Sequence, residues 1–168
     1  ADDLIADTDI VNPYARSYLS LCYGYAYFDR NPDAALDVVR RGLEVAQRSG
    51  NRTNATHLVV LMSRLEAQHG DPLEALAHLI SSIEHYHDAG NSGNLSTSLA
   101  LLAIILDRFG LPEQAATIIG FAVNALTRVT FPEITVTISR VRGLLGEQAY
   151  ESSTAAGWAM TTIEMTEY

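Results

Sequence analysis

Three prolines spaced 40 residues apart constrain the fold of this chain more than any other feature of its sequence. They are Pro32, Pro72 and Pro112, and each is followed within three residues by an acidic side chain and an alanine. A period of this length indicates one supersecondary unit used several times, with the apolar face of each copy buried by its neighbours. The spacing therefore predicts a helical repeat array, an architecture that usually binds other molecules rather than transforming them.

Glycines separate the repeated segments at regular positions. Gly50 and Gly90 mark the ends of the second helices, and Gly70 and Gly110 suit the left-handed residue just past a helix end. The prolines then fall in the first turn of the next helix, where a missing N–H costs nothing. Apolar residues follow the i, i+3, i+4, i+7 pattern between these points, which indicates α-helix throughout.

We expect an all-α fold of three to four antiparallel helical hairpins in a single domain over residues 1–168. The stretch from Thr130 to Ser139 is rich in β-branched residues and could form a strand. We favour helix, because Pro132 resembles a helix start and no second strand is available for pairing; whether the whole stretch is helical stays open. The hairpins are predicted near 12–48, 53–88, 94–127 and 132–156, with a capping helix at 159–168.

Charge and composition exclude several classes of partner. Acidic residues outnumber basic ones 20 to 11, giving a net charge of −9, which repels phosphate backbones and anionic lipid. All basic residues are arginine, which suggests a GC-rich bacterial genome. Cys22 is the only cysteine, so we expect a core residue in a protein of the reducing cytoplasm. The start lacks an initiating Met, which predicts a fragment of a longer protein.

The phrase from Gly70 to Leu76 resembles the turn and second-helix start of a tetratricopeptide repeat (TPR). In that pattern a small residue lets two helices approach closely. Ala35, Ala75 and Ala115 match it in the second helices. In the first helices the small position falls on Tyr23, Ser63, Ala103 and Gly143, of which Tyr23 departs from the pattern. The resemblance implies a TPR-like α-α superhelix with a period of 40.

The long period and the tail resemble the repeat region of bacterial signal-transduction ATPases, including LuxR-type and cyclase-linked regulators. The segments 145–150 and 156–161 are similar to the closing part of those proteins. The resemblance implies that any ATPase or cyclase activity lies outside this chain, which has no Gly-x-x-x-x-Gly-Lys-Ser/Thr phosphate loop. We therefore expect neither intrinsic catalysis nor a cofactor.

The first helices of stacked hairpins line the concave side of a superhelix, where side chains need not fill the core. Polar residues there predict a groove for a partner segment or small solute, with Arg64 and Arg108 binding carboxylates. The alternative is an ordinary solvated helix face. The candidates are Ser17, Ser20, Tyr27, His57, Arg64, Gln68, Thr97, Asp107, Arg108 and Arg140.

Two other clusters have weaker interpretations. The first helix carries six aromatic residues between Tyr14 and Phe28, which indicates a covered end of the array, an interface with a preceding domain or a homodimer contact. His78, His85 and His87 share one helix, but His78 and His85 are two turns apart, too far for one metal ion. We predict no metal site.

Together these features predict a non-catalytic interaction or sensor domain of a bacterial cytoplasmic signalling or transcriptional regulator. Its partner would be another protein, a neighbouring domain of the same polypeptide or a small ligand. One alternative is a scaffold that mediates only self-association or docking. Another is an enzyme on a helical array, which would need two titratable groups within hydrogen-bond reach in a deep pocket.

Overall fold

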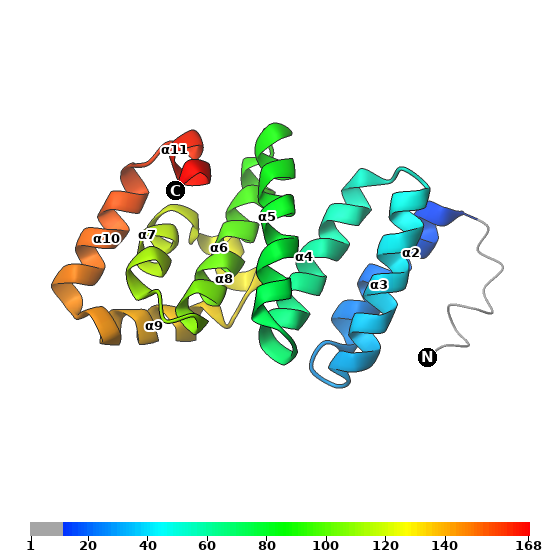
Figure 1. Cartoon of the computed structure of the whole chain (residues 1–168), viewed down its shortest axis with the longest axis horizontal. Coiled ribbons are helices and arrows are strands. Elements are labelled where there is room, and N and C mark those ends of the chain that lie inside the picture. Colours follow the sequence, from blue (N-terminus) through cyan, green and yellow to red (C-terminus); the bar gives the residue numbers. More distant parts are fainter. Residues whose placement is uncertain (1–11) are drawn as a thin grey trace. The chain divides into compact units, whose positions relative to one another are not determined.

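The computed structural model describes residues 12–168, which form ten helices and no β-strand (Figure 1). The all-α prediction is confirmed for this part of the chain. No helix in it is both long and apolar enough to cross a lipid bilayer. The helices are α2 (Pro13–Tyr27), α3 (Pro32–Arg48), α4 (Arg52–His69), α5 (Pro72–Asp88), α6 (Ser92–Arg108), α7 (Pro112–Ala122), α8 (Ala125–Thr130), α9 (Ile134–Leu145), α10 (Glu147–Ala159) and α11 (Thr162–Glu167).

The three prolines that define the sequence period each form the first residue of a helix, as predicted. Proline suits this position because its fixed φ is helical and its missing N–H would have no intrahelical acceptor. Asparagine caps start the helices between them. The side-chain oxygens of Asn51 and Asn91 each accept a hydrogen bond at 3.2 Å from the backbone N–H three residues later. Such caps stabilise a helix by about 1 kcal/mol each.

Glycines end the helices where a left-handed backbone is needed. Gly110 has a φ of 73°, so the left-handed backbone predicted there is confirmed, and Gly50 and Gly90, predicted to mark helix ends, have φ values of 69° and 64°. Gly70 differs, with φ −128° and ψ −141°, and the left-handed prediction is wrong there. Helix α4 continues to His69, so Gly70 is itself the cap and its N–H bonds to the Glu66 carbonyl.

The predicted helix over 112–127 is two helices. Asn124 breaks it, because its side chain accepts hydrogen bonds from the N–H groups of Leu126 and Thr127 while the Thr127 hydroxyl accepts one from the Asn124 N–H. This reciprocal arrangement is a capping box, which starts α8. The sequence did not predict this break because the apolar periodicity continues across it.

The ambiguous stretch over 130–139 contains no strand. Thr130 ends α8, residues 131–133 form a turn, and the helix predicted there begins at Ile134. Residues 147–159 form a longer helix than the one predicted to end at 156, and the last helix begins at Thr162 rather than 159.

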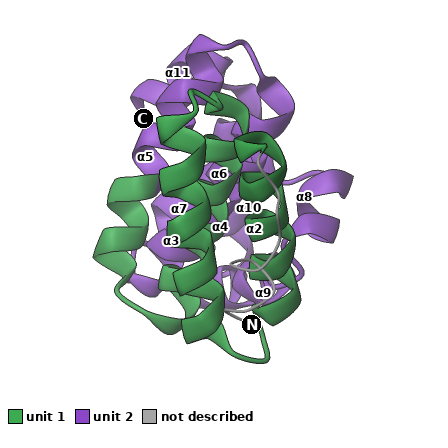
Figure 2. Ribbon diagram, turned by 90° about the vertical axis from the view of Figure 1, so that its right-hand side faces the viewer, with its two compact units in different colours: residues 1–78 green, residues 79–168 purple. Residues whose placement is uncertain are grey.

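Unit 1, which ends at His78, is one of two compact units in the chain (Figure 2). Helix α2 packs against α3 and α4, and α3 packs against α4. Gly24 allows this approach, because a Cβ there would lie 2.5 Å from Val39 Cγ2. Cys22 is exposed on α2, so its predicted core position is wrong. The core contains Phe28, Ala35, Val39, Ala46, Leu58, Leu61, Met62 and Leu65.

Unit 2 runs from Leu79 to Tyr168 and is built around α6 and α7. Helices α7 and α10 approach each other backbone to backbone. A Cβ at Gly120 would overlap the Thr154 carbonyl, and a Cβ at Gly157 would overlap that of Thr117. The glycine pair therefore fixes how near the two helices lie.

The small positions expected from the TPR resemblance have mixed outcomes. Those of the second helices are completely buried, as are Ser63 and Ala103 in the first helices. Gly143 is exposed with nothing near it, so close packing at that position is wrong. In α2 the close contact is made by Gly24 rather than by its half-buried neighbour Tyr23.

Candidate functional site: two grooves between helices

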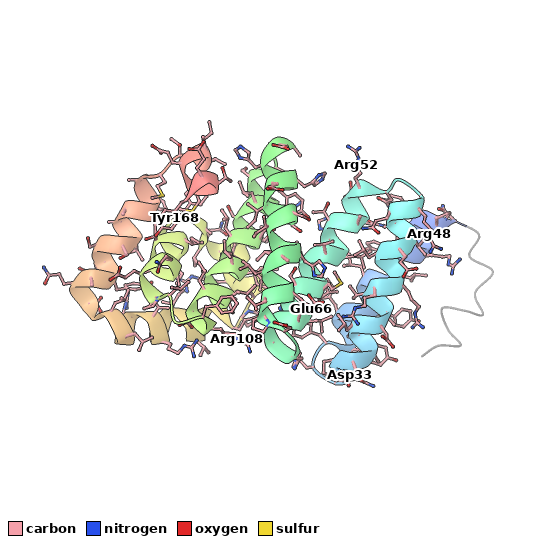
Figure 3. The ribbon with its side chains drawn as sticks, viewed as in Figure 1. Asp33, Arg48, Arg52, Glu66, Arg108 and Tyr168 are labelled. Carbon is pink, nitrogen blue, oxygen red and sulfur yellow. The ribbon has the colours of Figure 1, made fainter. Side chains whose placement is uncertain are left out.

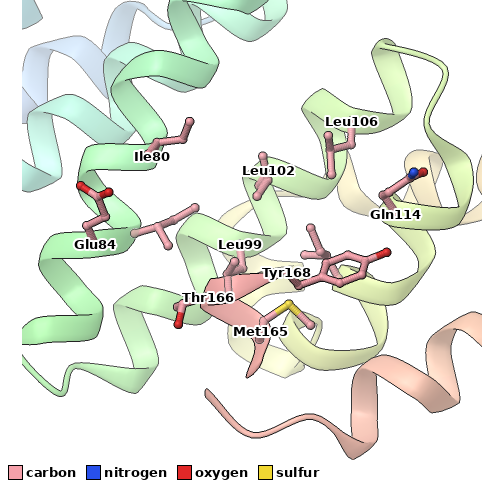
Figure 4. Close-up of a pocket in the computed structure, with 11 residues that line it drawn as sticks. Ile80, Glu84, Leu99, Leu102, Leu106, Gln114, Met165, Thr166 and Tyr168 are labelled. Carbon is pink, nitrogen blue, oxygen red and sulfur yellow. The ribbon is translucent and has the colours of Figure 1, made fainter. Parts of the chain in front are cut away.

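Unit 2 contains an apolar groove of about 290 Å³ between α5 and α7, with α6 as its floor. Leu99, Leu102 and Leu106 form the floor, and Figure 4 shows Ile80 and Gln114 on opposite sides of the same space. Mostly apolar lining with a few polar groups is typical of ligand and peptide sites. The lining residues are Ile80, Ile83, Glu84, Leu99, Leu102, Leu106, Gln114, Ile118, Met165, Thr166 and Tyr168.

Helix α11 already covers part of this groove. Met165 is only 3% exposed and serves as its apolar anchor, and Tyr168 also lines the space. A capping box holds the start of the helix, with the Thr161 N–H donating to Glu164 Oε2 at 2.7 Å. The hydrogen bonds from Thr161 lower the pKa of the Glu164 carboxyl. The groove thus holds a short amphipathic helix supplied by the chain itself.

Unit 1 contains a groove of the same construction, with a volume of about 420 Å³. It lies between α3 and the start of α5, with α4 as its floor. Its floor carries Met62 and Glu66, and its walls also carry charge. The lining residues are Arg40, Leu43, Glu44, Gln47, Met62, Glu66, Glu74, Ala77 and His78.

Glu66 is a buried carboxylate at the centre of this second groove. Its side chain is 2% exposed, and Figure 3 shows it among the helices whereas Arg48 and Arg52 extend from the surface. Glu66 Oε2 lies 3.0 Å from His78 Nδ1. Oε1 lies 3.6 Å from the Arg40 guanidinium and accepts no hydrogen bond from the described residues. A buried carboxylate oxygen in this state is energetically costly unless something pairs with it.

The two grooves correspond residue by residue at a shift of 40. The paired positions differ in chemistry: charged residues in unit 1 are mostly replaced by apolar or neutral ones in unit 2. Glu66, for example, is replaced by Leu106. The seven pairs are Arg40 and Ile80, Leu43 and Ile83, Glu44 and Glu84, Met62 and Leu102, Glu66 and Leu106, Glu74 and Gln114, and His78 and Ile118.

The unit 1 groove brings a histidine and a carboxylate together. A histidine held by a carboxylate, as His78 is by Glu66, is the arrangement that general bases use. However, no hydroxyl or thiol side chain lines this groove for such a base to activate. In residues 12–168, no group of three or more His, Cys, Asp or Glu side chains is arranged to hold a metal ion.

Two of the residues predicted to line a concave wall are buried in unit 1. The Ser17 hydroxyl accepts a hydrogen bond at 2.9 Å from Asn54 Nδ2, and the Ser20 hydroxyl donates to the Arg16 carbonyl. Their exposed fractions are 0% and 3%, so their placement on an open wall is wrong. Both help α2 pack, because hydroxyls that bond locally can be buried at low cost.

The other unit 1 candidates are half-buried. The Arg64 guanidinium lies 4.4 Å from the centre of the Phe28 ring, an arrangement that stabilises cation and aromatic ring together. Burial raises the pKa of the Tyr25 hydroxyl, and the charge of Arg64 opposes that rise. Burial lowers the pKa of His57. Tyr27 stacks with Tyr23, and Gln68 is half-buried on the same helix as Arg64.

Among the unit 2 candidates, the structure joins Asp107 and Arg140. Arg140 Nε donates to Asp107 Oδ2 at 2.8 Å, which connects α6 to α9. Asp107 is 2% exposed at its side chain, so this ion pair is a structural connection. Thr97 bonds to the carbonyl of Asn94 in its own helix, and Arg108 is exposed. Binding by the predicted wall stays a prediction.

None of the ten predicted residues lines either groove. Sequence reasoning placed the site on the first helices alone, whereas each groove also draws residues from two second helices. Comparison of the sequence with itself at a shift of 40 residues could have indicated the groove, because Glu66 and His78 align with Leu106 and Ile118 of the next repeat. Charged residues that replace apolar ones at equivalent positions indicate a change of ligand chemistry.

Comparison with protein-family models, with curated proteins and with solved structures finds no match to this chain.

Proposed function

We propose that this chain is a TPR-like interaction domain that binds helical segments of protein partners in the grooves between successive hairpins. The observation that carries the proposal is the correspondence of the two grooves at a 40-residue shift. An accidental surface hollow would not recur at equivalent positions with the same floor. Repetition of one binding geometry along the chain is the way in which repeat proteins build extended recognition surfaces.

The position of α11 in the unit 2 groove supports the proposal that this groove binds a helical segment. Its single buried anchor, Met165, resembles the way in which amphipathic helices bind in grooves, with one or two apolar side chains inserted. The remaining volume of about 290 Å³ suits the apolar side chains of a further helical segment. Glu84 and Gln114 on the two sides would hydrogen-bond to its polar flank.

The resemblance to bacterial signalling ATPases implies a regulatory role for this binding. In a cytoplasmic regulator of that kind, occupation of the grooves would hold or release a neighbouring ATPase or output domain. Such a switch requires that the partner bind two arrangements of the protein with unequal affinity. A scaffold that only docks or self-associates would use the same grooves without the switch.

A display library of random helical peptides selected against the protein tests the proposal. We expect peptides with apolar anchors to be enriched and to lose binding to the variant Leu106→Trp, whose indole would fill the unit 2 groove. The matched control is Leu126→Trp on α8, since Leu126 is 57% exposed and does not line the groove.

The two variants separate the outcomes. Enriched peptides that bind Leu126→Trp but not Leu106→Trp would support the groove as the binding site. Peptides that bind all three proteins equally, or a library from which nothing is enriched, would contradict the proposed function. If a small metabolite raised the melting temperature of the wild type but not of Leu106→Trp, the groove would be a small-molecule sensor instead.

A further inference from the structure

We propose that the unit 1 groove binds an arginine-bearing helical segment of a partner protein, with the arginine guanidinium paired to Glu66. This inference rests on the proposed interaction function and names the partner chemistry of one groove. Three independent features support it: the buried carboxylate oxygen without a hydrogen bond, the charge of the groove walls, and the equivalence with the groove that α11 covers.

The buried carboxylate supplies the recognition element. Glu66 Oε1 accepts no hydrogen bond from the described residues, and the Arg40 guanidinium approaches it only to 3.6 Å. Arg40 is half-exposed at its side chain, and a ligand guanidinium that displaced it would replace one cation beside Glu66 with another. A ligand guanidinium would then approach to hydrogen-bonding distance, where charge-assisted pairs with carboxylates are strongest.

The walls of the groove favour a cation. Three carboxylates, on Glu44, Glu66 and Glu74, line it together with the single guanidinium of Arg40. The chain as a whole carries a net charge of −9, which also attracts cationic segments and accelerates their association. An anionic or purely apolar ligand would leave these carboxylates uncompensated.

The shape of the site argues for a helical occupant rather than a free amine. Seven lining positions are equivalent to those of the unit 2 groove, which is partly covered by α11. In that groove apolar walls accompany the apolar anchor Met165. In the unit 1 groove Leu106 is replaced by Glu66 and Ile118 by His78, so the matching occupant carries a cationic side chain. Leu43, Met62 and Ala77 still provide apolar contact for its stem.

The probe is an alanine-rich helical peptide of about 16 residues with arginines spaced four apart, long enough to be partly helical in water. The same peptide with citrulline keeps the shape but removes the charge and replaces one NH2 group of the guanidinium with a carbonyl oxygen. Binding of both to the whole chain is measured by isothermal calorimetry and mapped by amide chemical shifts. We expect the arginine peptide to bind at residues of α3, α4 and α5, and the citrulline peptide to bind at least about tenfold more weakly.

Variants assign the binding to Glu66. Glu66→Gln should weaken the arginine peptide by about 10- to 100-fold, the usual range for a lost hydrogen bond to a charged group. The matched control is Glu84→Gln, which makes the same charge change in the unit 2 groove and should leave binding unchanged. If Glu66→Gln fails to fold, the variant Ala77→Arg tests the same site. Ala77 is exposed, and an arginine there would occupy the groove and should weaken peptide binding.

Three results would overturn the inference. They are equal affinity for the arginine and citrulline peptides, unchanged binding by a folded Glu66→Gln or Ala77→Arg variant, and agmatine binding as tightly as the peptide. The last would identify a small-amine site. None of these affects peptides whose binding depends on Leu106, so the proposed interaction function can stand or fail separately.

Discussion

Single glycines decide how closely helices α7 and α10 approach. Gly120 and Gly157 lie where the two backbones meet, and a Cβ at either would overlap a carbonyl of the facing helix. Gly143 on α9 has open space around it. The same residue type therefore has opposite consequences at these positions: close packing in the first case, and only a weakened helix in the second.

Gly157→Ala is expected to lower the free energy of unfolding by roughly 1–3 kcal/mol, because the methyl group forces the helices apart. Gly143→Ala should instead raise it by up to about 1 kcal/mol, since alanine is the better helix former and meets nothing. Urea unfolding of both variants measures the difference. A stabilised Gly157→Ala variant would show that the helices are not in backbone contact.

His57 makes stability depend on pH. Burial lowers its pKa in the folded protein below the ordinary value of 6.5, so the unfolded chain binds the proton more readily. The contribution is therefore fully present above pH 6.5 and is lost as the pH falls toward the lowered pKa. We expect the free energy of unfolding of His57→Gln to fall less than that of the wild type between neutral pH and pH 5. Urea unfolding at each pH measures this difference. Parallel pH profiles would contradict this.

At the scale of helices, local rules predicted most of the fold. Gly50, Gly90 and Gly110 end helices because only glycine adopts their positive φ without strain. The helix break at Asn124 was not predicted. The capping box there is a local signal, but the apolar periodicity continues across it. The prediction of a left-handed backbone is wrong at Gly70 because Gly70 is itself the cap of α4, whereas Gly110 lies one residue beyond Phe109, the cap of α6.

The grooves were harder to predict than the helices. A groove depends on which faces of three helices meet, and this is set by tertiary packing rather than by periodicity within one helix. The predicted wall residues Ser17 and Asp107 illustrate the difficulty, since both are polar yet buried in hydrogen bonds. Polar character in sequence does not separate a binding surface from a position that is buried in the packed interior.

The ion pair between α6 and α9 allows a test at the same scale. Arg140→Ala should lower the free energy of unfolding by about 1–3 kcal/mol, because it leaves the buried Asp107 carboxylate without its charged partner. Arg108→Ala, which removes an exposed arginine, should change it by less than about 0.5 kcal/mol. Both are measured by urea unfolding. Equal effects would mean that the pair contributes nothing.

For the whole molecule, the main result is a pair of grooves that share seven lining positions at a 40-residue shift and differ in chemistry. Unit 1 presents a charged groove around Glu66, and unit 2 presents an apolar groove that α11 partly covers. Under the proposed function, the two grooves would bind partner segments of different chemistry.

The account depends on the equivalence of successive hairpins, and a crystal structure of the chain tests this most directly. Residues 53–82 of one hairpin are to be superimposed on residues 93–122 of the next. We expect the helices to coincide and the paired groove residues, such as Glu66 and Leu106, to occupy the same positions. Hairpins that do not superimpose after the 40-residue shift, or paired residues that point to different faces, would contradict the account.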